Sequence, residues 1–301
     1  MLVALEVRAA APGNANLATA ALASPRPRDC RGARGGVDGL WTRARAGDAQ
    51  RYCDLLARGY ARLAQTPAEA LVAAQAAEAI VGPAAQVRVL NGRAKLRLGQ
   101  ASAALEQFAK AESEDAQAFL DPKSLHDYAR ATSLAGKPAD AVRLYRTLVS
   151  RSALLDDPRE KCVLQIEAAA HVLAYTPGGS DEALGYLVQA RRESLGLSPW
   201  VTGLRLLADV RNGRAEHAPG ASPAPSLASL TQPVSTAFDE SPLLPPGELE
   251  ALLAALTEAT DPVESRRYAQ LFLTHAKSEN VWLAQARKKR AEPAAGKGKA
   301  H

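Results

Sequence analysis

Residues 136–148 read GKPADAVRLYRTL, and three other stretches of the chain can be superposed on them without gaps. These are QTPAEALVAAQAA at 65–77, GQASAALEQFAKA at 99–111 and GGSDEALGYLVQA at 178–190. In all four blocks the sixth residue is Ala, the seventh is aliphatic, and the tenth and thirteenth are apolar or aromatic. Positions 6, 7, 10 and 13 form one stripe of an α-helix. Each block therefore predicts a helix that buries this stripe.

The spacing of the blocks predicts helix pairs. The sixth-position alanines, Ala70, Ala104, Ala141 and Ala183, stand 34, 37 and 42 residues apart. A period of this length has room for a second helix and two turns. A second apolar stripe precedes three of the blocks, in YCDLLARGYARL, VRVLNGRAKLRL and LHDYARATSL. We expect stacked helix pairs, and an unrelated bundle is the alternative, because an Ala-rich composition inflates such matches.

Over residues 48–214 the pattern resembles the tetratricopeptide repeat family. That family places a small residue and an aromatic on the first helix of each pair, then Ala, an aromatic and Ala on the second. The block alanines match the second-helix positions, while Gly92 and the pair Tyr128 and Ala129 match first-helix positions. The signature Trp is absent, the terminal Pro is missing from most units, and the periods are longer. The resemblance implies an all-α, right-handed α-solenoid of helix-turn-helix pairs.

The rest of the chain divides by composition. Seven prolines between residues 215 and 247 indicate an extended linker. The sequence ELEALLAALTEAT at 248–260 predicts an amphipathic helix, and a second apolar-striped helix runs from Pro262 towards Arg290. These C-terminal helices, at 248–290, either cap the solenoid or form a separate hairpin. The predicted ends are a partly disordered segment at 1–47 and a disordered basic tail at 291–301.

The net charge of +5 is concentrated at the two ends of the chain. Residues 287–301 carry six basic residues against one acidic residue, and residues 1–47 carry seven Arg against three acidic residues. By difference, the body between them has a net charge of −4. A mildly acidic body does not present the single basic face of a nucleic-acid-binding domain. Nucleic-acid association through RKKR at 287–290 and the basic tail is therefore kept only as the alternative function.

Apolar runs and cysteines indicate the compartment. No apolar run approaches the roughly 18 residues that span a bilayer, so we expect no transmembrane segment. The N-terminal MLVALEVRAAA ends in small residues like a signal-peptide cleavage site, but charged residues interrupt it and no basic residue precedes it. We expect a cytoplasmic protein by default, with export or a periplasmic location as the alternative. A disulfide between Cys30 and Cys53 would require export, because a reducing cytosol would not keep it.

The sequence contains none of the common catalytic or cofactor motifs. The C-terminal GKGKAH lacks the spacing and the Ser or Thr of a phosphate-binding loop, and no GxSxG elbow occurs. The histidines His126, His171 and His275 form no HExxH motif, and the three cysteines form no CxxC motif. We therefore expect no catalytic residues, no cofactor and no metal site.

The expected function is a non-enzymatic interaction or assembly scaffold that binds a partner protein or peptide in a concave groove. The resemblance implies that the first helix of each pair lines this groove. Basic residues recur on those helices, and the candidate groove residues are Arg62, Arg93, Arg97, Lys123, His126 and Arg130, with Arg58 nearby. A basic groove would suit an acidic peptide or a free carboxylate. The alternative is that these side chains form the solvated faces of amphipathic helices.

Overall fold

The computed structural model describes residue 30 and residues 46–193, 198–212, 250–251, 254–255 and 262–275. Within these residues every regular element is a helix and no strand occurs, so the expected all-α class is confirmed. The chain divides into two compact units, residues 1–118 and 119–301. The predicted repeat domain at 48–214 spans both units. The predicted linker at 215–247, the tail at 291–301 and most of the N-terminal segment lie outside the described residues.

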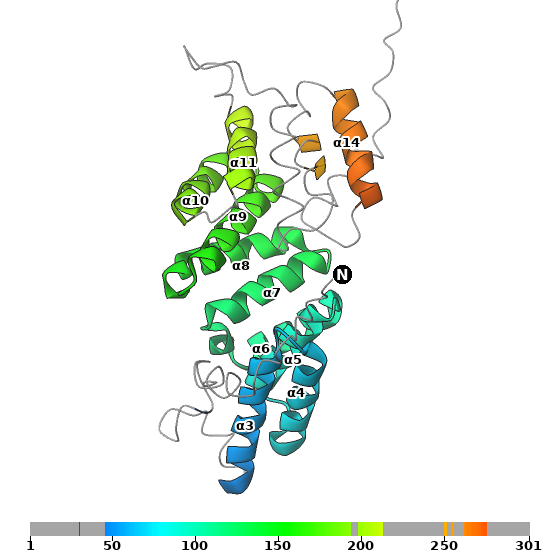
Figure 1. Ribbon diagram of the computed structural model, residues 1–301, viewed down its shortest axis with the longest axis vertical. Coiled ribbons are helices and arrows are strands. Elements are labelled where there is room, and N and C mark those ends of the chain that lie inside the picture. Colours follow the sequence, from blue (N-terminus) through cyan, green and yellow to red (C-terminus); the bar gives the residue numbers. More distant parts are fainter. Residues whose placement is uncertain are drawn as a thin grey trace, which may run out of the picture. The chain divides into compact units, whose positions relative to one another are not determined.

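In the first unit four helices pack on one another in chain order. They are α3 (Ala46–Arg62), α4 (Pro67–Val81), α5 (Ala85–Arg97) and α6 (Ala101–Glu114). Each helix packs on the next, and α3 with α4 and α5 with α6 form the closest pairs (Figure 1). A short 3₁₀ turn, Ala116–Phe119, follows α6. This consecutive packing is typical of helical repeats.

The second unit shows the same pattern. Its elements are α7 (Pro122–Leu134), α8 (Pro138–Ser150), a 3₁₀ turn (Ser152–Leu154), α9 (Pro158–Tyr175), α10 (Ser180–Glu193), α11 (Ser198–Arg211) and α14 (Pro262–His275). Helices α7 to α11 pack in chain order, with the closest contacts between α9 and α10 (Figure 1). None of the helices within the described ranges is long and apolar enough to cross a membrane.

The ends of the helices follow from local sequence signals. Proline stands at the start of α4, α7, α8 and α9, where its missing N–H leaves no intrahelical bond unmade. Asp121 caps α7 by accepting hydrogen bonds from the backbone N–H groups of Lys123 and Ser124. Asp157 caps α9 in the same way, accepting from the N–H of Arg159 at 2.9 Å. These caps fix where the first helices of the second unit begin.

Glycine makes the turns inside the helix pairs. Gly99, Gly136 and Gly178, which lie in the turns before three of the second helices, have φ values of 76°, 82° and 70°. Only glycine adopts this left-handed conformation without steric cost, so each glycine lets the chain reverse between two helices. The interpretation of Gly178 as an inter-helix turn is confirmed.

Most of the predicted stripe of each block is buried, but at the seventh position only Val142 is buried, and Leu71, Leu105 and Leu184 are half-buried. The sixth-position alanines are fully buried in all four blocks, as are the thirteenth-position residues. At the tenth position Ala74, Phe108 and Leu187 are fully buried, and Tyr145 is 1% exposed. The four blocks therefore form the second helix of each pair, α4, α6, α8 and α10, with the predicted face in the core.

The first helices need small residues where neighbouring helices approach. A Cβ atom at Gly92 of α5 would lie 2.7 Å from a ring carbon of Phe108, the tenth residue of the second block. At Gly59 of α3 a Cβ atom would lie 2.5 Å from a methyl carbon of Leu90. Real Cβ atoms do not come this close, so both glycines allow close helix packing. Gly92 is also the residue that matches the small first-helix position of the tetratricopeptide pattern.

The C-terminal elements share a core with the last helix pairs. Ala251, Ala254 and Ala255, together with Ala269 and Phe272, belong to one hydrophobic cluster with buried residues of α9, α10 and α11. The hydroxyl of Ser265 on α14 donates to the main-chain oxygen of Ala254, which joins these two segments. This arrangement is the one that the capping alternative expects.

Candidate functional site

The candidate groove residues fall in both units. Arg62 lies on α3, and Arg93 and Arg97 lie on α5, in the first unit. The other three, Lys123, His126 and Arg130, lie on α7 in the second unit. Their spacing of three and four residues places them on one face of that helix. The structure therefore brings together the three candidates of α7.

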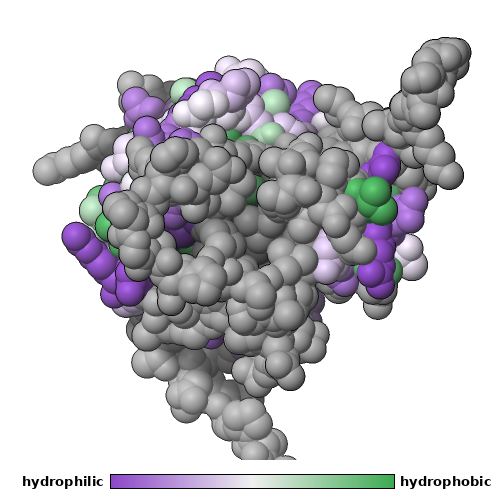
Figure 2. Space-filling model, turned by 90° about the horizontal axis from the view of Figure 1, so that it is seen from above, coloured by the Kyte–Doolittle hydropathy of each residue, from purple (hydrophilic) through white to green (hydrophobic). Residues whose placement is uncertain are grey.

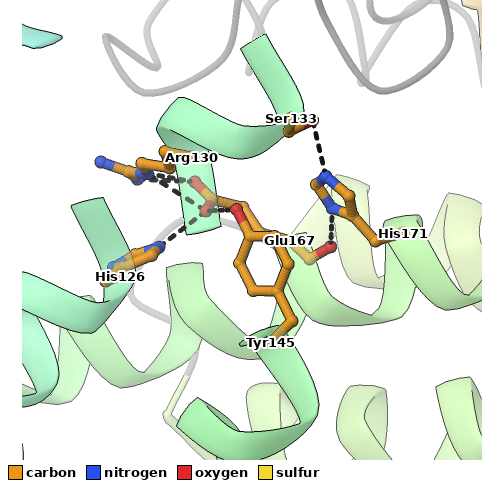
Figure 3. A network of polar contacts seen from close by, with 6 residues as sticks. All are labelled: His126, Arg130, Ser133, Tyr145, Glu167 and His171. Atoms are coloured by element: carbon orange, nitrogen blue, oxygen red, sulfur yellow. Dashed lines mark hydrogen bonds and ion pairs between the residues drawn. The ribbon is translucent and has the colours of Figure 1, made fainter. Parts of the chain in front are cut away.

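The three candidates of α7 all meet carboxylates of α9. Lys123 Nζ lies 3.1 Å from Oε2 of Glu160. His126 Nε2 lies 2.7 Å from Oε2 of Glu167 (Figure 3). Arg130 donates to both oxygens of the same carboxylate, through Nη2 at 2.6 Å and Nε at 3.1 Å. This face is therefore a row of ion pairs that joins two first helices.

Glu167 is the centre of a network that connects three helices. Besides His126 and Arg130 of α7, the hydroxyl of Tyr145 on α8 donates to Oε2 of Glu167 at 2.8 Å. Tyr145 is the tenth residue of the third block, so a core position of the repeat also supplies a donor to the network. The Glu167 side chain is 16% exposed and the His126 side chain 12% exposed. A carboxylate with this many donors holds the three helices together.

Electrostatics keep this network charged. Burial by itself raises the pKa of Glu167, but the neighbouring Arg130 and His126 outweigh it and hold that pKa well below its ordinary value. Burial likewise lowers the pKa of Arg130, and Glu167 outweighs it, so that pKa is raised. Burial, reinforced by Glu167, raises the pKa of Tyr145 well above its usual range. The carboxylate therefore stays ionised at neutral pH and Tyr145 stays a donor.

A buried histidine and serine lie beside the network. His171 Nδ1 is 2.7 Å from the main-chain oxygen of Glu167, and His171 Nε2 is 2.9 Å from Oγ of Ser133 (Figure 3). Because a carbonyl oxygen only accepts, Nδ1 carries the proton and Nε2 accepts from the serine hydroxyl. Burial lowers the pKa of His171 to about 4, so its ring is neutral at pH 7.

This serine and histidine pair is structural. Ser133 is 6% exposed and His171 is 5% exposed, so a substrate has no access to the hydroxyl. A pocket of about 460 Å³ at the end of α9 is lined by residues such as Tyr175, Thr176 and Asn212, and neither Ser133 nor His171 lines it. The pair therefore acts as another fixed contact between α7 and α9.

The contacts between neighbouring pairs repeat at a nearly constant offset. From α7 to α9 they join Lys123 to Glu160, Arg130 to Glu167 and Ser133 to His171, which are 37, 37 and 38 residues apart. From α8 to α10 the two guanidinium hydrogen bonds of Arg146 to Glu182, each 2.8 Å, join residues 36 apart. Because the order of contacts is the same on both helices, α7 and α9 run in the same direction. The α7–α8 and α9–α10 pairs therefore stack in parallel.

The first-unit candidates also have partners within the chain. Arg62 forms an ion pair with Glu69 of α4 at 3.0 Å. The guanidinium carbon of Arg93 lies 5.7 Å from the ring centroid of Tyr60 on α3, a cation–π contact. Arg97 is exposed, and it too interacts with another group of the chain. The six candidates therefore do not form a row of unpaired cations.

Sequence reasoning missed the acidic half of the site. Glu160 and Glu167 lie seven residues apart, as Lys123 and Arg130 do, and the two sets are separated by 37 residues. The block alanines of the two pairs that these residues join, Ala141 and Ala183, stand 42 residues apart, so the offset of the charges is five residues shorter than the local repeat period. Comparing charges at that period would not have paired them, and the signal in the sequence was the seven-residue spacing that the two basic and the two acidic residues share.

The exposed large apolar side chains among the described residues are distributed over several elements. Exposed apolar side chains such as Val72, Leu154, Val188 and Val263 lie on different elements. In Figure 2 the coloured surface is mostly hydrophilic with small separate hydrophobic areas. Among the described residues no group of three or more His, Cys, Asp or Glu is placed to hold a metal ion.

Neither protein-family models nor curated proteins match this chain. The helix pairs and their contacts are therefore the observations that bear on its function.

Proposed function

We propose that the chain is a non-enzymatic protein-interaction or assembly scaffold, built as a right-handed, tetratricopeptide-like solenoid. The partner, a protein or peptide, binds along the surface formed by the first helices of the pairs. The observation that carries this proposal is the parallel stacking of α7 on α9 through Lys123, His126, Arg130 and their carboxylate partners. Stacked helix pairs present extended surfaces of this kind.

The row of ion pairs between α7 and α9 has a buried part, which supports the helices, and an exposed part, which can contact a partner. His126, Arg130 and Glu167 are largely buried and hold the two helices in place. Lys123 and Glu160 are 53% and 39% exposed at one end of the same row. A partner would contact the exposed pair, and the rigid network beneath it would reduce the entropy lost on binding. Surface ion pairs contribute little to stability, which leaves Lys123 and Glu160 free to exchange partners.

Site-specific photo-crosslinking tests this function. A photoreactive residue in place of Lys123 should give a discrete crosslinked product with a protein in extracts of the source cells. The matched control is Arg143, an exposed basic residue on the second helix α8. We expect no such product from position 143. Equal products from both positions, or none from position 123, would contradict the proposal. Crosslinks to nucleic acid that disappear as salt is raised would favour the alternative function.

A further inference from the structure

A disulfide bond ties residue 30 to the first helix of the first unit. Cys30 and Cys53 are bonded, with their Cα atoms 5.8 Å apart and a separation of 23 residues in sequence. Both are half-buried against the hydrophobic cluster that contains Tyr52, Leu56 and Leu90. The bond is therefore part of the packed core of this unit.

The position of Cys53 on α3 shows where residue 30 is held. Cys53 and Tyr60 are seven residues apart, so they lie on one stripe of the helix. The guanidinium of Arg93, on α5, lies over the ring of Tyr60. The disulfide thus attaches residue 30 to the same stripe of α3 that contacts the next first helix.

The third cysteine is protected from thiol chemistry by burial. Cys162 on α9 is fully buried, and its thiol donates to the main-chain oxygen of Ala190 at 3.4 Å. An odd cysteine exposed in an oxidising compartment would form bonds between chains. Here the odd thiol is enclosed between α9 and α10, and the other two are paired with each other.

We propose that Cys30 and Cys53 are an oxidation site and that the chain folds and works in an oxidising compartment. The co-reactant is a dithiol–disulfide oxidant. One cysteine thiolate attacks the oxidant's disulfide and forms a mixed disulfide, releasing one thiol of the oxidant. The second cysteine thiolate then displaces the other oxidant sulfur and closes the Cys30–Cys53 bond. Two electrons and two protons pass from the cysteine pair to the oxidant, which becomes a dithiol. The proposal favours the exported or periplasmic alternative over the cytoplasmic default, because disulfides persist where the surroundings are oxidising.

The test is the thiol state of the full chain in its source cells. Cells are quenched in acid, the protein is denatured without reductant, and free thiols are alkylated and counted by intact mass. We expect one alkylated thiol per chain, and a non-reducing digest should contain a peptide that joins Cys30 to Cys53. Three alkylated thiols would overturn the proposal, and so would a bond that involves Cys162.

The purified full chain provides the second readout. After equilibration with oxidised glutathione it should be lighter than the reduced chain by the mass of two hydrogen atoms. Reduction should then lower its melting temperature by roughly 5 °C or more. The Cys162→Ser variant should show the same shift, whereas Cys30→Ser should show none, because it cannot form the bond. A reductant shift that persists in Cys30→Ser would contradict the assignment.

Discussion

At the residue scale, the contacts between helices depend on side chains that are buried and still polar. His171 is neutral because burial depresses its pKa, and Glu167 is ionised because Arg130 and His126 outweigh the effect of burial on its pKa. Both groups bind protons more weakly in the folded chain than in the unfolded chain. Their stabilisation is therefore present at neutral pH and is lost as the pH falls.

The pH dependence of folding tests this directly. For His171 the free energy of unfolding should begin to fall near pH 6.5, its ordinary pKa, and should continue to fall down to about pH 4. Over this range the decrease should be roughly 3 kcal/mol. Protonation of Glu167 should lower the free energy of unfolding further below pH 4.5. Urea unfolding between pH 7.5 and 4 measures the slope. The His171→Gln variant should be flatter between pH 6.5 and 4, and equal slopes for both proteins would refute the assigned burial.

The block alanines give a second test at this scale. Ala104 and Ala141 are fully buried at the sixth position, where the first helix comes close, whereas Gln107 is half-buried on the same helix as Ala104. Replacing either alanine by Trp should cost about 1 to 3 kcal/mol through overpacking. Gln107→Trp should cost less. Equal melting temperatures for the three variants would show that the helical register is wrong.

At the scale of the elements, the sequence predicted the buried face within each helix and missed the contacts between residues far apart in the chain. The helical stripe of each block is a short-range pattern, so the buried face of α4, α6, α8 and α10 could be predicted before the fold was known. The contacts of Glu167 join residues 22 to 41 positions apart and arise only when helix pairs stack. In addition, α9 has 18 residues where α7 has 13, which hides the repeat offset between these helices.

The contact between α5 and α6 can be tested at Gly92. Alanine at an exposed helix position stabilises by about 1 kcal/mol relative to glycine. At Gly92 the new Cβ would press on the Phe108 ring, so Gly92→Ala should instead destabilise the chain by about 1 to 3 kcal/mol. In a Phe108→Leu background the same substitution should cost less, because the ring is gone. A stabilising Gly92→Ala in the original chain would contradict the close approach.

At the scale of the whole molecule, the C-terminal segments pack against the last helices of the stacked pairs. Their shared core with α9, α10 and α11 indicates that residues 48–214 lose a packed surface when cut from the rest. The matched pair Phe272 and Leu271 tests this within the full chain, since Phe272 is fully buried and Leu271 is 37% exposed. Phe272→Ala should cost about 3 kcal/mol or more, and Leu271→Ala less than about 1 kcal/mol. Similar small effects would mean that α14 is not part of this core.

The stacking of successive helix pairs through their first helices is the central claim, and a double-mutant cycle on Arg130 and Glu167 tests it most directly. Urea unfolding of Arg130→Met, Glu167→Gln and the double variant gives the coupling energy between α7 and α9. The matched control cycle combines Arg130→Met with Glu106→Gln, on an exposed residue of the first unit. We predict a coupling of about 1 to 3 kcal/mol for the first cycle and none within error for the control. Additive effects at Arg130 and Glu167 would contradict the stacked arrangement.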